Sequence, residues 1–470
     1  MDRVPIMIMG CTSDAGKSFV VTALCRYFAN QGLSVAPFKA QNISNNAAVT
    51  TEGLEMGRAQ YIQALAARTV PQARMNPVLL KPSGDTYSQV IVLGRFDPAI
   101  TTLPWDKRKS RLWPVVCDAL RGLRAEYDQV VIEGAGSPAE INLRDGDIVN
   151  MSVAKECGAN VYLVSDIDRG GSFAHLIGTW MCLEADERAL VKGFVLNKFR
   201  GDSTLLGDGV AWLQDRTGVP TVAIVPLVPH TLPEEDTFRH RAEPVVGHVN
   251  IALIVYPYAS NLDEFDPLVY ERGVCVVPIV GFARLDSFDA ILLPGSKNVG
   301  ASLHFLRESG LERELMRAGR NGTTIMGICG GMQLLGHSIR DPNQLEGGDM
   351  ECLGLLDVTT TLDIDKTTRQ RKVRWLHGEM VEGYEIHHGR TLTGPCSRPH
   401  LGDELGWEQN NARGVYLHGL FENTEYRVHF LQSLGWHGRT EDWRARLDFE
   451  MERVATLIVS SGWSLKLDAG

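Results

Sequence analysis

Short apolar runs alternate with longer amphipathic stretches along the first half of the chain. The apolar runs are rich in β-branched residues and lie at 4–9, 33–38, 130–132, 161–164, 194–196 and 222–225. After the first run, apolar residues recur at helical spacing, as Val20, Leu24 and Phe28 do. Strands that alternate with helices pack as a mostly parallel sheet with helices on both faces, and ligands bind at the carboxyl ends of the strands. The pattern therefore predicts an α/β fold.

The alternation is interrupted by a stretch rich in Pro, Glu and His between Pro226 and His248. Such a stretch is typical of a connection between domains. A second α/β series begins at 251–255 and ends near His418, and the chain beyond Glu422 has the spacing of amphipathic helices. We therefore predict an α/β domain at 1–230, a linker at 231–248, a second α/β domain at 249–440 and a helical segment at 441–470.

The first apolar run leads into a loop that ends in Gly-Lys-Ser and precedes a predicted helix. Between a strand and a helix, the backbone N–H groups of such a loop bind phosphate oxygens, its lysine neutralises the outer phosphates, and its hydroxyl ligates Mg²⁺. The predicted nucleotide-binding residues here are Gly10, Thr12, Ser13, Asp14, Ala15, Gly16, Lys17 and Ser18. The first glycine lies one position earlier than usual, because Cys11 occupies the common position. This longer loop resembles the dethiobiotin synthetase branch of phosphate-loop enzymes.

A carboxylate follows another predicted strand of the first domain. Glu133 comes directly after the run at 130–132 and precedes a glycine-rich turn. A carboxylate at a strand end beside a phosphate loop suits Mg²⁺, bound directly or through water. We predict a metal site formed by Ser18, Glu133 and the nucleotide, with a surface glutamate before a turn as the alternative. A second acidic ligand is not obvious, and Asp14 is the nearest acid.

In the second domain, the sequence Gly327-Ile-Cys329-Gly330-Gly331 follows an apolar segment and precedes a helix-like stretch. Glycines permit the tight strand-to-helix turn that exposes a nucleophile, and the helix N-terminus favours a thiolate. His418 closes the apolar run that begins at Gly414 and provides a candidate base. We predict that Cys329 is a catalytic nucleophile and that His418 accepts its proton. The alternatives are a buried structural cysteine and a core histidine.

A nucleophilic cysteine also needs donors for the oxyanion and a partner that orients its base. We predict two backbone N–H donors, one from Gly330 and one from the Pro294-Gly295-Ser296 turn, assigned to Gly295. The residue two positions after His418 is Leu420, so no acid stands at this position close to the base. Glu422 and Glu385 are candidates for the orienting acid. A dyad, in which a backbone carbonyl or a water orients His418, is equally compatible with the sequence.

Composition narrows the function class. The chain has 470 residues and a net charge of −10, which argues against a nucleic-acid binder because such proteins need a basic face. Its nine cysteines are scattered and include no Cys-x-x-Cys pair, so we expect a reduced, cytoplasmic protein without a structural zinc site. We expect no membrane span, because no apolar run has the necessary length, and no cleaved signal, because cleavage would destroy the phosphate loop. The oligomeric state is not indicated.

Segments throughout both predicted domains resemble those of cobyric acid synthases. They begin at Gln41 (Gln-Asn-Ile-Ser-Asn-Asn), Glu133 (Glu-Gly-Ala-Gly-Ser-Pro-Ala-Glu-Ile-Asn-Leu), Ser165 (Ser-Asp-Ile-Asp-Arg-Gly-Gly), Asn197 (Asn-Lys-Phe-Arg-Gly-Asp), Ser260 (Ser-Asn-Leu-Asp-Glu-Phe-Asp), Gly383 (Gly-Tyr-Glu-Ile-His) and Gly414 (Gly-Val-Tyr-Leu-His-Gly-Leu-Phe). The resemblance implies a dethiobiotin-synthetase-like phosphate-loop domain, in which Asn197 contacts the nucleotide base. It also implies a class I, triad-type glutamine amidotransferase domain.

The same resemblance implies a glutamine-dependent ligase of cobalamin biosynthesis that uses ATP, Mg²⁺ and L-glutamine. Its corrinoid substrate is adenosylcobyrinic acid a,c-diamide, and amidation of the b, d, e and g carboxylates gives adenosylcobyric acid. The chemistry fits the two motifs. A carboxylate resists ammonia until ATP phosphorylates it, and a cysteine that attacks glutamine releases neutral ammonia. On this interpretation 1–230 is the amidoligase domain and 249–440 the glutaminase domain.

Four alternatives remain at this stage. A sister ligase that amidates the a and c carboxylates of cobyrinic acid, or a CTP synthase, joins similar domains. A ParA-like partition switch would use the phosphate loop alone, but such proteins carry an extra lysine early in the loop and residues 10–16 contain none. A cysteine hydrolase without a ligase activity leaves the first domain without a role.

Overall fold

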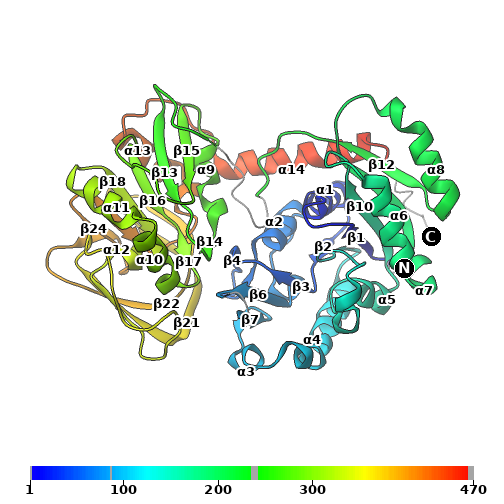
Figure 1. Cartoon of the computed structure of the whole chain (residues 1–470), viewed down its shortest axis with the longest axis horizontal. Helices are drawn as coiled ribbons and strands as arrows, with labels where there is room; N and C mark the ends of the chain where they lie inside the picture. Colours follow the sequence, from blue (N-terminus) through cyan, green and yellow to red (C-terminus); the bar gives the residue numbers. More distant parts are fainter. Residues whose placement is uncertain (1–2, 85–86, 234–241, 464–470) are drawn as a thin grey trace.

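The computed structural model describes residues 3–84, 87–233 and 242–463, which form two α/β units that lie side by side (Figure 1). The first unit contains the chain up to β12 together with the last helix, and the second contains the chain from β13 to α13. Two mostly parallel sheets flanked by helices confirm the predicted fold class. Among the described residues, none of the helices is both long enough and apolar enough to cross a bilayer.

The first unit is built on a six-stranded parallel sheet with the strand order β12-β11-β10-β1-β9-β2. Its strands are β1 (Ile6–Gly10), β2 (Val35–Phe38), β9 (Gln129–Glu133), β10 (Asn160–Asp166), β11 (Val191–Phe199) and β12 (Thr221–Pro226). The helices of this unit are α1 (Lys17–Asn30), α2 (Arg58–Ala66), α3 (Pro98–Thr101), α4 (Trp105–Glu126), α5 (Met151–Cys157), α6 (Ser172–Cys182), α7 (Ala185–Arg188), α8 (Gly207–Thr217) and, from the end of the chain, α14 (Trp443–Ser460). Each predicted apolar run of this half lies on one of the six strands.

Alternation along the central strand explains why helices cover both faces of this sheet. Met7 and Met9 point to the face covered by α4, α5 and α6, whereas Ile6 and Ile8 point to the face covered by α1 and α14. All four side chains are buried. A strand that is apolar on both faces is what a parallel sheet between two helix layers requires.

Between β2 and α4, the chain forms short strands that the sequence pattern did not predict. A four-stranded sheet has the order β3-β6-β7-β8, and a separate hairpin joins β4 to β5. These strands are β3 (Gln41–Ile43), β4 (Ala47–Val49), β5 (Glu55–Gly57), β6 (Val78–Pro82), β7 (Ser88–Val92) and β8 (Arg95–Phe96). The hairpin and α2 lie on the side of the first unit that faces the second unit (Figure 1).

The second unit is built on a seven-stranded sheet with the order β15-β13-β16-β18-β25-β24-β23, parallel except at β24 and β23. These strands are β13 (Val249–Ile254), β15 (Val274–Ile279), β16 (Ala290–Leu293), β18 (Thr324–Ile328), β23 (Arg398–Leu401), β24 (Gly406–Gln409) and β25 (Ala412–Val415). Two short strands, β14 (Ala259–Ser260) and β17 (Gly295–Ser296), pair next to it. The helices are α9 (Asp266–Val269), α10 (Val299–Glu308), α11 (Leu311–Arg320), α12 (Gly330–Leu335) and α13 (Thr424–Ser433).

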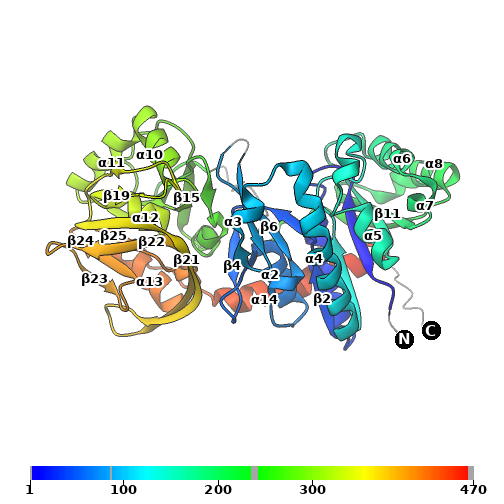
Figure 2. The same ribbon diagram turned by 90° about the horizontal axis from the view of Figure 1, so that it is seen from below.

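A long hairpin extends from the second unit towards the first. It consists of β21 (Val358–Arg374) and β22 (Met380–Thr393), and β19 (Ser338–Arg340) and β20 (Met350–Glu351) complete its sheet. Figure 2 shows the hairpin beside β4 of the first unit, and the Gln370 side chain donates a hydrogen bond of 2.9 Å to the Val49 carbonyl. The hairpin is therefore part of the interface between the units.

The helical segment predicted after residue 440 contains α14, which runs back to the first unit (Figure 1). Leu447, Met451 and Val454 are buried in the same core as Val20 and Leu24 of α1. The chain thus crosses between the units twice. Residues 234–241 of the predicted linker and 464–470 of the predicted helical segment lie outside the described residues, and the three predicted domain boundaries stay predictions.

Candidate active sites

Cys329 occupies a sharp turn between β18 and α12. Its φ of 51° is unusual for a residue with a side chain and indicates local strain. The turn depends on its neighbours, because a Cβ atom on Gly327 would lie 2.4 Å from the Gly331 backbone. The Cys329 thiol lies 3.5 Å from the Ile386 carbonyl oxygen, and its interaction with His418 helps to raise the pKa of that imidazole. This is the geometry predicted for a nucleophile on a strand-to-helix elbow.

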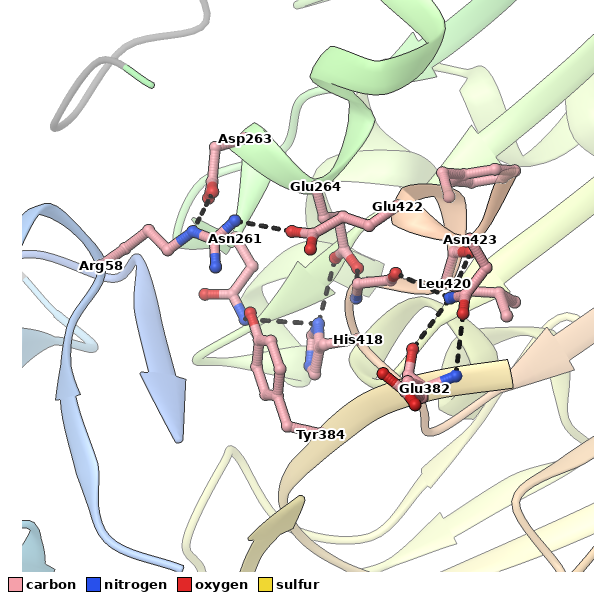
Figure 3. Close-up of polar contacts among 12 residues, drawn as sticks. Arg58, Asn261, Asp263, Glu264, Glu382, Tyr384, His418, Leu420, Glu422 and Asn423 are labelled. Carbon is pink, nitrogen blue, oxygen red and sulfur yellow. Dashed lines mark hydrogen bonds and ion pairs between the residues drawn. The ribbon is translucent and has the colours of Figure 1, made fainter. Parts of the chain in front are cut away.

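His418 follows β25 and is held by backbone hydrogen bonds to Tyr384 on both sides. Its N–H donates to the Tyr384 carbonyl at 2.9 Å, and its carbonyl accepts from the Tyr384 N–H at 3.2 Å. The His418 Nδ1 atom lies 3.0 Å from Glu264 Oε1 (Figure 3). If Nδ1 donates its proton to this carboxylate, Nε2 is left for the thiol. The fold therefore brings the predicted base and nucleophile together.

The electrostatics of His418 favour a bound proton. Burial by itself lowers the pKa of this imidazole, but the Glu264 carboxylate and the hydrogen bonds to Cys329 and Glu264 raise it to about 10. The side chains of His418 and Glu264 are each only 2% exposed, so water screens their interaction weakly. A histidine with this affinity for protons is suited to accept one from a thiol.

The acid that contacts His418 is Glu264, which the sequence analysis did not propose. Its Oε2 atom also accepts a hydrogen bond of 3.2 Å from the Gly419 N–H, so both oxygens are bound. The two acids that were proposed serve elsewhere: Glu422 pairs with Arg58, and Glu385 pairs with Arg369 and His387. Neither orients His418. Both proposed acids follow Cys329 in the chain, whereas Glu264 precedes it. Its place in the Ser260-Asn-Leu-Asp-Glu segment was the only sequence signal for Glu264.

The backbone around Cys329 favours one predicted oxyanion donor and disfavours the other. Gly330 begins α12 beside the nucleophile. Gly295 lies opposite Ser260 in the antiparallel β14–β17 pair, and the Lys297 N–H donates to the Tyr258 carbonyl at 3.0 Å. Because hydrogen-bonded pairs alternate along such a ladder, the Gly295 N–H points into the ladder.

The same alternation turns the N–H of the next residue, Ser296, out of the ladder. A Cβ atom on Gly330 would lie 2.7 Å from Ser296 N, so this nitrogen is close to the turn that carries Cys329. Ser296 is therefore a better candidate for the second donor than Gly295, and the assignment within the Pro294-Gly295-Ser296 turn moves by one residue.

The predicted phosphate loop connects β1 to α1. Gly16 has a φ of 94° and precedes the helix. Asn197, at the end of β11, donates a hydrogen bond of 2.9 Å to the Ala15 carbonyl, and a Cβ atom on Gly16 would lie 2.0 Å from its side-chain nitrogen. Lys17 is buried, and its Nζ lies 3.4 Å from the Gly136 carbonyl. The structure thus brings the loop, the strand end at Asn197 and the glycine-rich turn after Glu133 together.

Ser18 and Glu133, the predicted metal ligands, are in direct contact. The Ser18 hydroxyl lies 2.9 Å from Glu133 Oε1, and the Lys39 ammonium lies 2.9 Å from the same oxygen. Gln63 donates to the other oxygen, and Glu133 is fully buried. Within the described part of the chain, no group of three or more His, Cys, Asp and Glu residues could hold a metal ion. A hydroxyl and a carboxylate fit Mg²⁺ when phosphate oxygens and waters complete the octahedron.

Comparisons with known proteins assign the two units separately. Residues 6–236 match the CobQ/CobB/MinD/ParA nucleotide binding domain, and residues 250–426 match the CobB/CobQ-like glutamine amidotransferase domain. The first match contains the predicted phosphate loop, and the second contains Cys329 and His418.

Relatives named cobyric acid synthase match nearly the whole chain. The protein of Deinococcus radiodurans is 52% identical over 444 residues, which are 91% of this chain and 92% of the relative. The proteins of a Polaromonas and an Acidovorax species are 47% and 49% identical, and each match covers 89% of this chain and 90% of the relative. By these similarities, and in agreement with its two centres, the chain belongs to the cobyric acid synthase family.

Proposed function

We propose that this enzyme amidates the b, d, e and g carboxylates of adenosylcobyrinic acid a,c-diamide, using ATP and L-glutamine, to give adenosylcobyric acid. The observation that carries the proposal is the contact of Cys329, His418 and Glu264 in one unit, next to a second unit with a phosphate loop. Relatives at about half identity over nine tenths of the chain support the substrate.

In the glutaminase centre, the Cys329 sulfur attacks the side-chain amide carbon of glutamine. His418 accepts the thiol proton and returns it to the departing nitrogen, so that ammonia and a glutamyl thioester form. Glu264 orients the imidazole and stabilises its protonated form. The N–H groups of Gly330 and Ser296 bind the oxyanion. Water then hydrolyses the thioester, with His418 as the base, and glutamate leaves.

In the amidoligase centre, a corrinoid carboxylate attacks the γ-phosphate of ATP and displaces ADP. Ammonia then attacks the acyl phosphate, which releases inorganic phosphate and leaves the amide. Lys17 and the loop N–H groups stabilise the charge that develops on the transferred phosphoryl group. Ser18 and Glu133 would hold Mg²⁺, which when bound neutralises phosphate charge. Asn197 fixes the loop through Ala15 and contacts the nucleotide base.

The substrate assignment is tested with purified protein and both corrinoid acceptors. With ATP, Mg²⁺ and glutamine, we expect four amides to form on adenosylcobyrinic acid a,c-diamide, measured by mass spectrometry as successive losses of one mass unit per carboxylate converted. Amide formation on cobyrinic acid, but not on its a,c-diamide, would contradict the proposal and favour the sister ligase.

We further propose that the enzyme works in the cytoplasm. All nine cysteines of the chain are free, and several of them are buried in the two cores. Free thiols persist in a reducing compartment. Secretion into an oxidising compartment in the native host, measured by fractionation, would contradict this location.

A further inference from the structure

Arg58, the first residue of α2, reaches across the interface between the units. Its Nε lies 2.7 Å from Asp263 Oδ2, and its Nη2 lies 2.7 Å from Glu422 Oε1 (Figure 3). Both carboxylates belong to the second unit, and the Arg58 side chain is only 8% exposed. An arginine that is buried between two partners of another unit holds their relative positions more firmly than an exposed ion pair does.

Both partners of Arg58 belong to the segments that carry the glutaminase residues. Asp263 precedes Glu264 in one short 3₁₀ helix, Leu262–Phe265. Glu422 ends another, Leu420–Glu422, which begins just after His418. Figure 3 shows the Arg58 guanidinium with the carboxylates of Asp263 and Glu422, next to the contact of Glu264 with His418. Arg58 therefore ties together, from the other unit, the two segments whose contact orients His418.

The β4 strand reinforces this hold on the same segment. Asn261 donates its N–H to Asn46 Oδ1 at 2.7 Å, and its side-chain oxygen accepts from the Ala47 N–H at 3.0 Å. The Asn261 side-chain nitrogen lies 3.3 Å from His418 Nδ1. The Tyr384 hydroxyl donates to the Ala47 carbonyl, and its ring stacks on His418. Asn46 and Ala47 of the first unit thus contact Asn261 and Tyr384, which both lie against the imidazole.

The position of Arg58 is unfavourable unless the interface forms. A cation in the first turn of a helix opposes the helix dipole. Asp263 and Glu422 compensate for this through their ion pairs with Arg58. Burial raises the pKa of the neighbouring Glu264 and Asp263 raises it further, so without Arg58 an uncompensated carboxylate would act on the acid that contacts His418. A cation at a helix N-terminus breaks the usual preference for acidic residues there. Such exceptions are expected at positions with a functional role.

The same helix also contacts the phosphate centre. Gln63, fully buried on α2, donates a hydrogen bond to Glu133, the predicted metal ligand. Arg58 and Gln63 are separated by about 7.5 Å along the helix axis, at 1.5 Å per residue. A helix of this length moves as one body. One element of the first unit therefore touches the acid of the phosphate centre and the segments that orient the glutaminase base.

We propose that Arg58 is a positioning residue of the glutaminase centre, and that α2 couples the binding of nucleotide at Glu133 to the alignment of Glu264 with His418. This inference rests on the proposed function. Ligand binding at Glu133 would change the contact of this carboxylate with Gln63, and α2 would carry that change through Arg58 to Asp263 and Glu422. Coupling between two binding equilibria is reciprocal, so any change that the nucleotide makes in the affinity for glutamine is matched by an equal change that glutamine makes in the affinity for the nucleotide.

The test is steady-state glutamine hydrolysis by the full chain, with and without a non-hydrolysable ATP analogue and Mg²⁺. For the wild type we expect the analogue to raise kcat for glutamine severalfold. For Arg58→Ala we expect kcat to fall by about tenfold or more, because a misplaced base slows the reaction. KM for glutamine should change little, and the stimulation should vanish. Arg58→Lys, which keeps the cation, should recover part of both effects.

Asp263→Asn keeps the shape of the partner and removes its charge, so it tests the same contact if Arg58→Ala does not fold. The matched control is Gln370→Ala, which removes another hydrogen bond between the units, to the Val49 carbonyl, and should leave kcat and stimulation unchanged. Amidation with added ammonium salt should persist in the Arg58 variants.

The coupling would be overturned if folded Arg58→Ala kept the wild-type kcat and the wild-type stimulation. It would also be overturned if the wild type did not respond to the analogue. These outcomes differ from a failure of the proposed function, in which Cys329→Ala would still hydrolyse glutamine.

Discussion

The two centres differ in how much of their chemistry the protein supplies by itself. In the proposed glutaminase centre, the nucleophile, the base and the acid are all side chains of the chain, and Glu264 contacts the base His418. In the phosphate centre, the proposed ligands Ser18 and Glu133 would provide two oxygens to a Mg²⁺ ion, and phosphates and waters would have to supply the rest. The comparison suggests that the first centre is fixed by folding, whereas the second is completed by its substrate.

The largest expected effect separates the two centres. Cys329→Ala removes the nucleophile, so glutamine-supported amidation should fall by about 10⁴-fold or more. Amidation supported by ammonium salt should stay near the wild-type rate, because the phosphate centre is untouched. Product formation is measured by mass spectrometry with each nitrogen source. A folded Cys329→Ala protein that lost both activities would mean that the centres are not separate.

A change in the phosphate centre should affect both nitrogen sources. Lys17→Ala removes the cation that stabilises the transferred phosphoryl group, which we expect to cost about 10²- to 10³-fold in amidation with glutamine and with ammonium alike. ATP hydrolysis coupled to the acceptor is the measurement. Normal amidation by this variant would show that phosphoryl transfer does not occur at the loop.

Glu264 tests whether the glutaminase centre depends on its third residue. Glu264→Gln keeps the shape but loses the charge, and we expect kcat for glutamine hydrolysis to fall by about 10²-fold. Glu422→Gln serves as a comparison within the same network, because it contacts Arg58 and not His418, and its effect should be smaller. Equal losses in the two variants would argue against a special role for Glu264.

The stability of the glutaminase unit should depend on pH through His418. Because the pKa of this imidazole is raised to about 10 in the folded state, its stabilising effect is complete below its ordinary pKa of 6.5 and is lost as pH rises through about 10. The difference in unfolding free energy between wild type and His418→Gln should therefore shrink between about pH 6.5 and 10. Chemical denaturation at several pH values measures it. A difference that stayed constant between pH 6.5 and 10 would mean that the imidazole is neutral in the folded protein over this range.

The smallest expected effect concerns α14 and stability. Met451 is buried against α1, and Met451→Ala should lower the free energy of unfolding by about 2–5 kcal/mol. Val459 lies exposed on the same helix, so Val459→Ala should cost about 0.5 kcal/mol or less. Urea denaturation of both variants measures the difference. Equal stabilities would mean that α14 is not part of the core of the first unit.

Short sequence patterns predicted the elements that depend on neighbouring residues in the chain, namely strands and tight turns. The parallel strands follow from apolar runs, and the turns at Gly16 and Cys329 follow from short motifs. Glu264 was missed because its contact with His418 joins residues far apart in the chain. The shift from Gly295 to Ser296 has another cause. Consecutive residues of a strand direct their N–H groups to opposite sides, so the direction depends on pairing with β14, which the motif does not encode.

The return of α14 to the first unit has a consequence for synthesis on the ribosome. The face of α1 that lies against α14 belongs to the same buried core as Leu447 and Met451, which are translated hundreds of residues later, and Arg26 on this face contacts Met451. Until then the nascent chain exposes this apolar face, a surface that chaperones bind and that promotes aggregation. Expression yield should therefore suffer most from changes that delay or remove the last helix, even though that helix carries none of the predicted site residues.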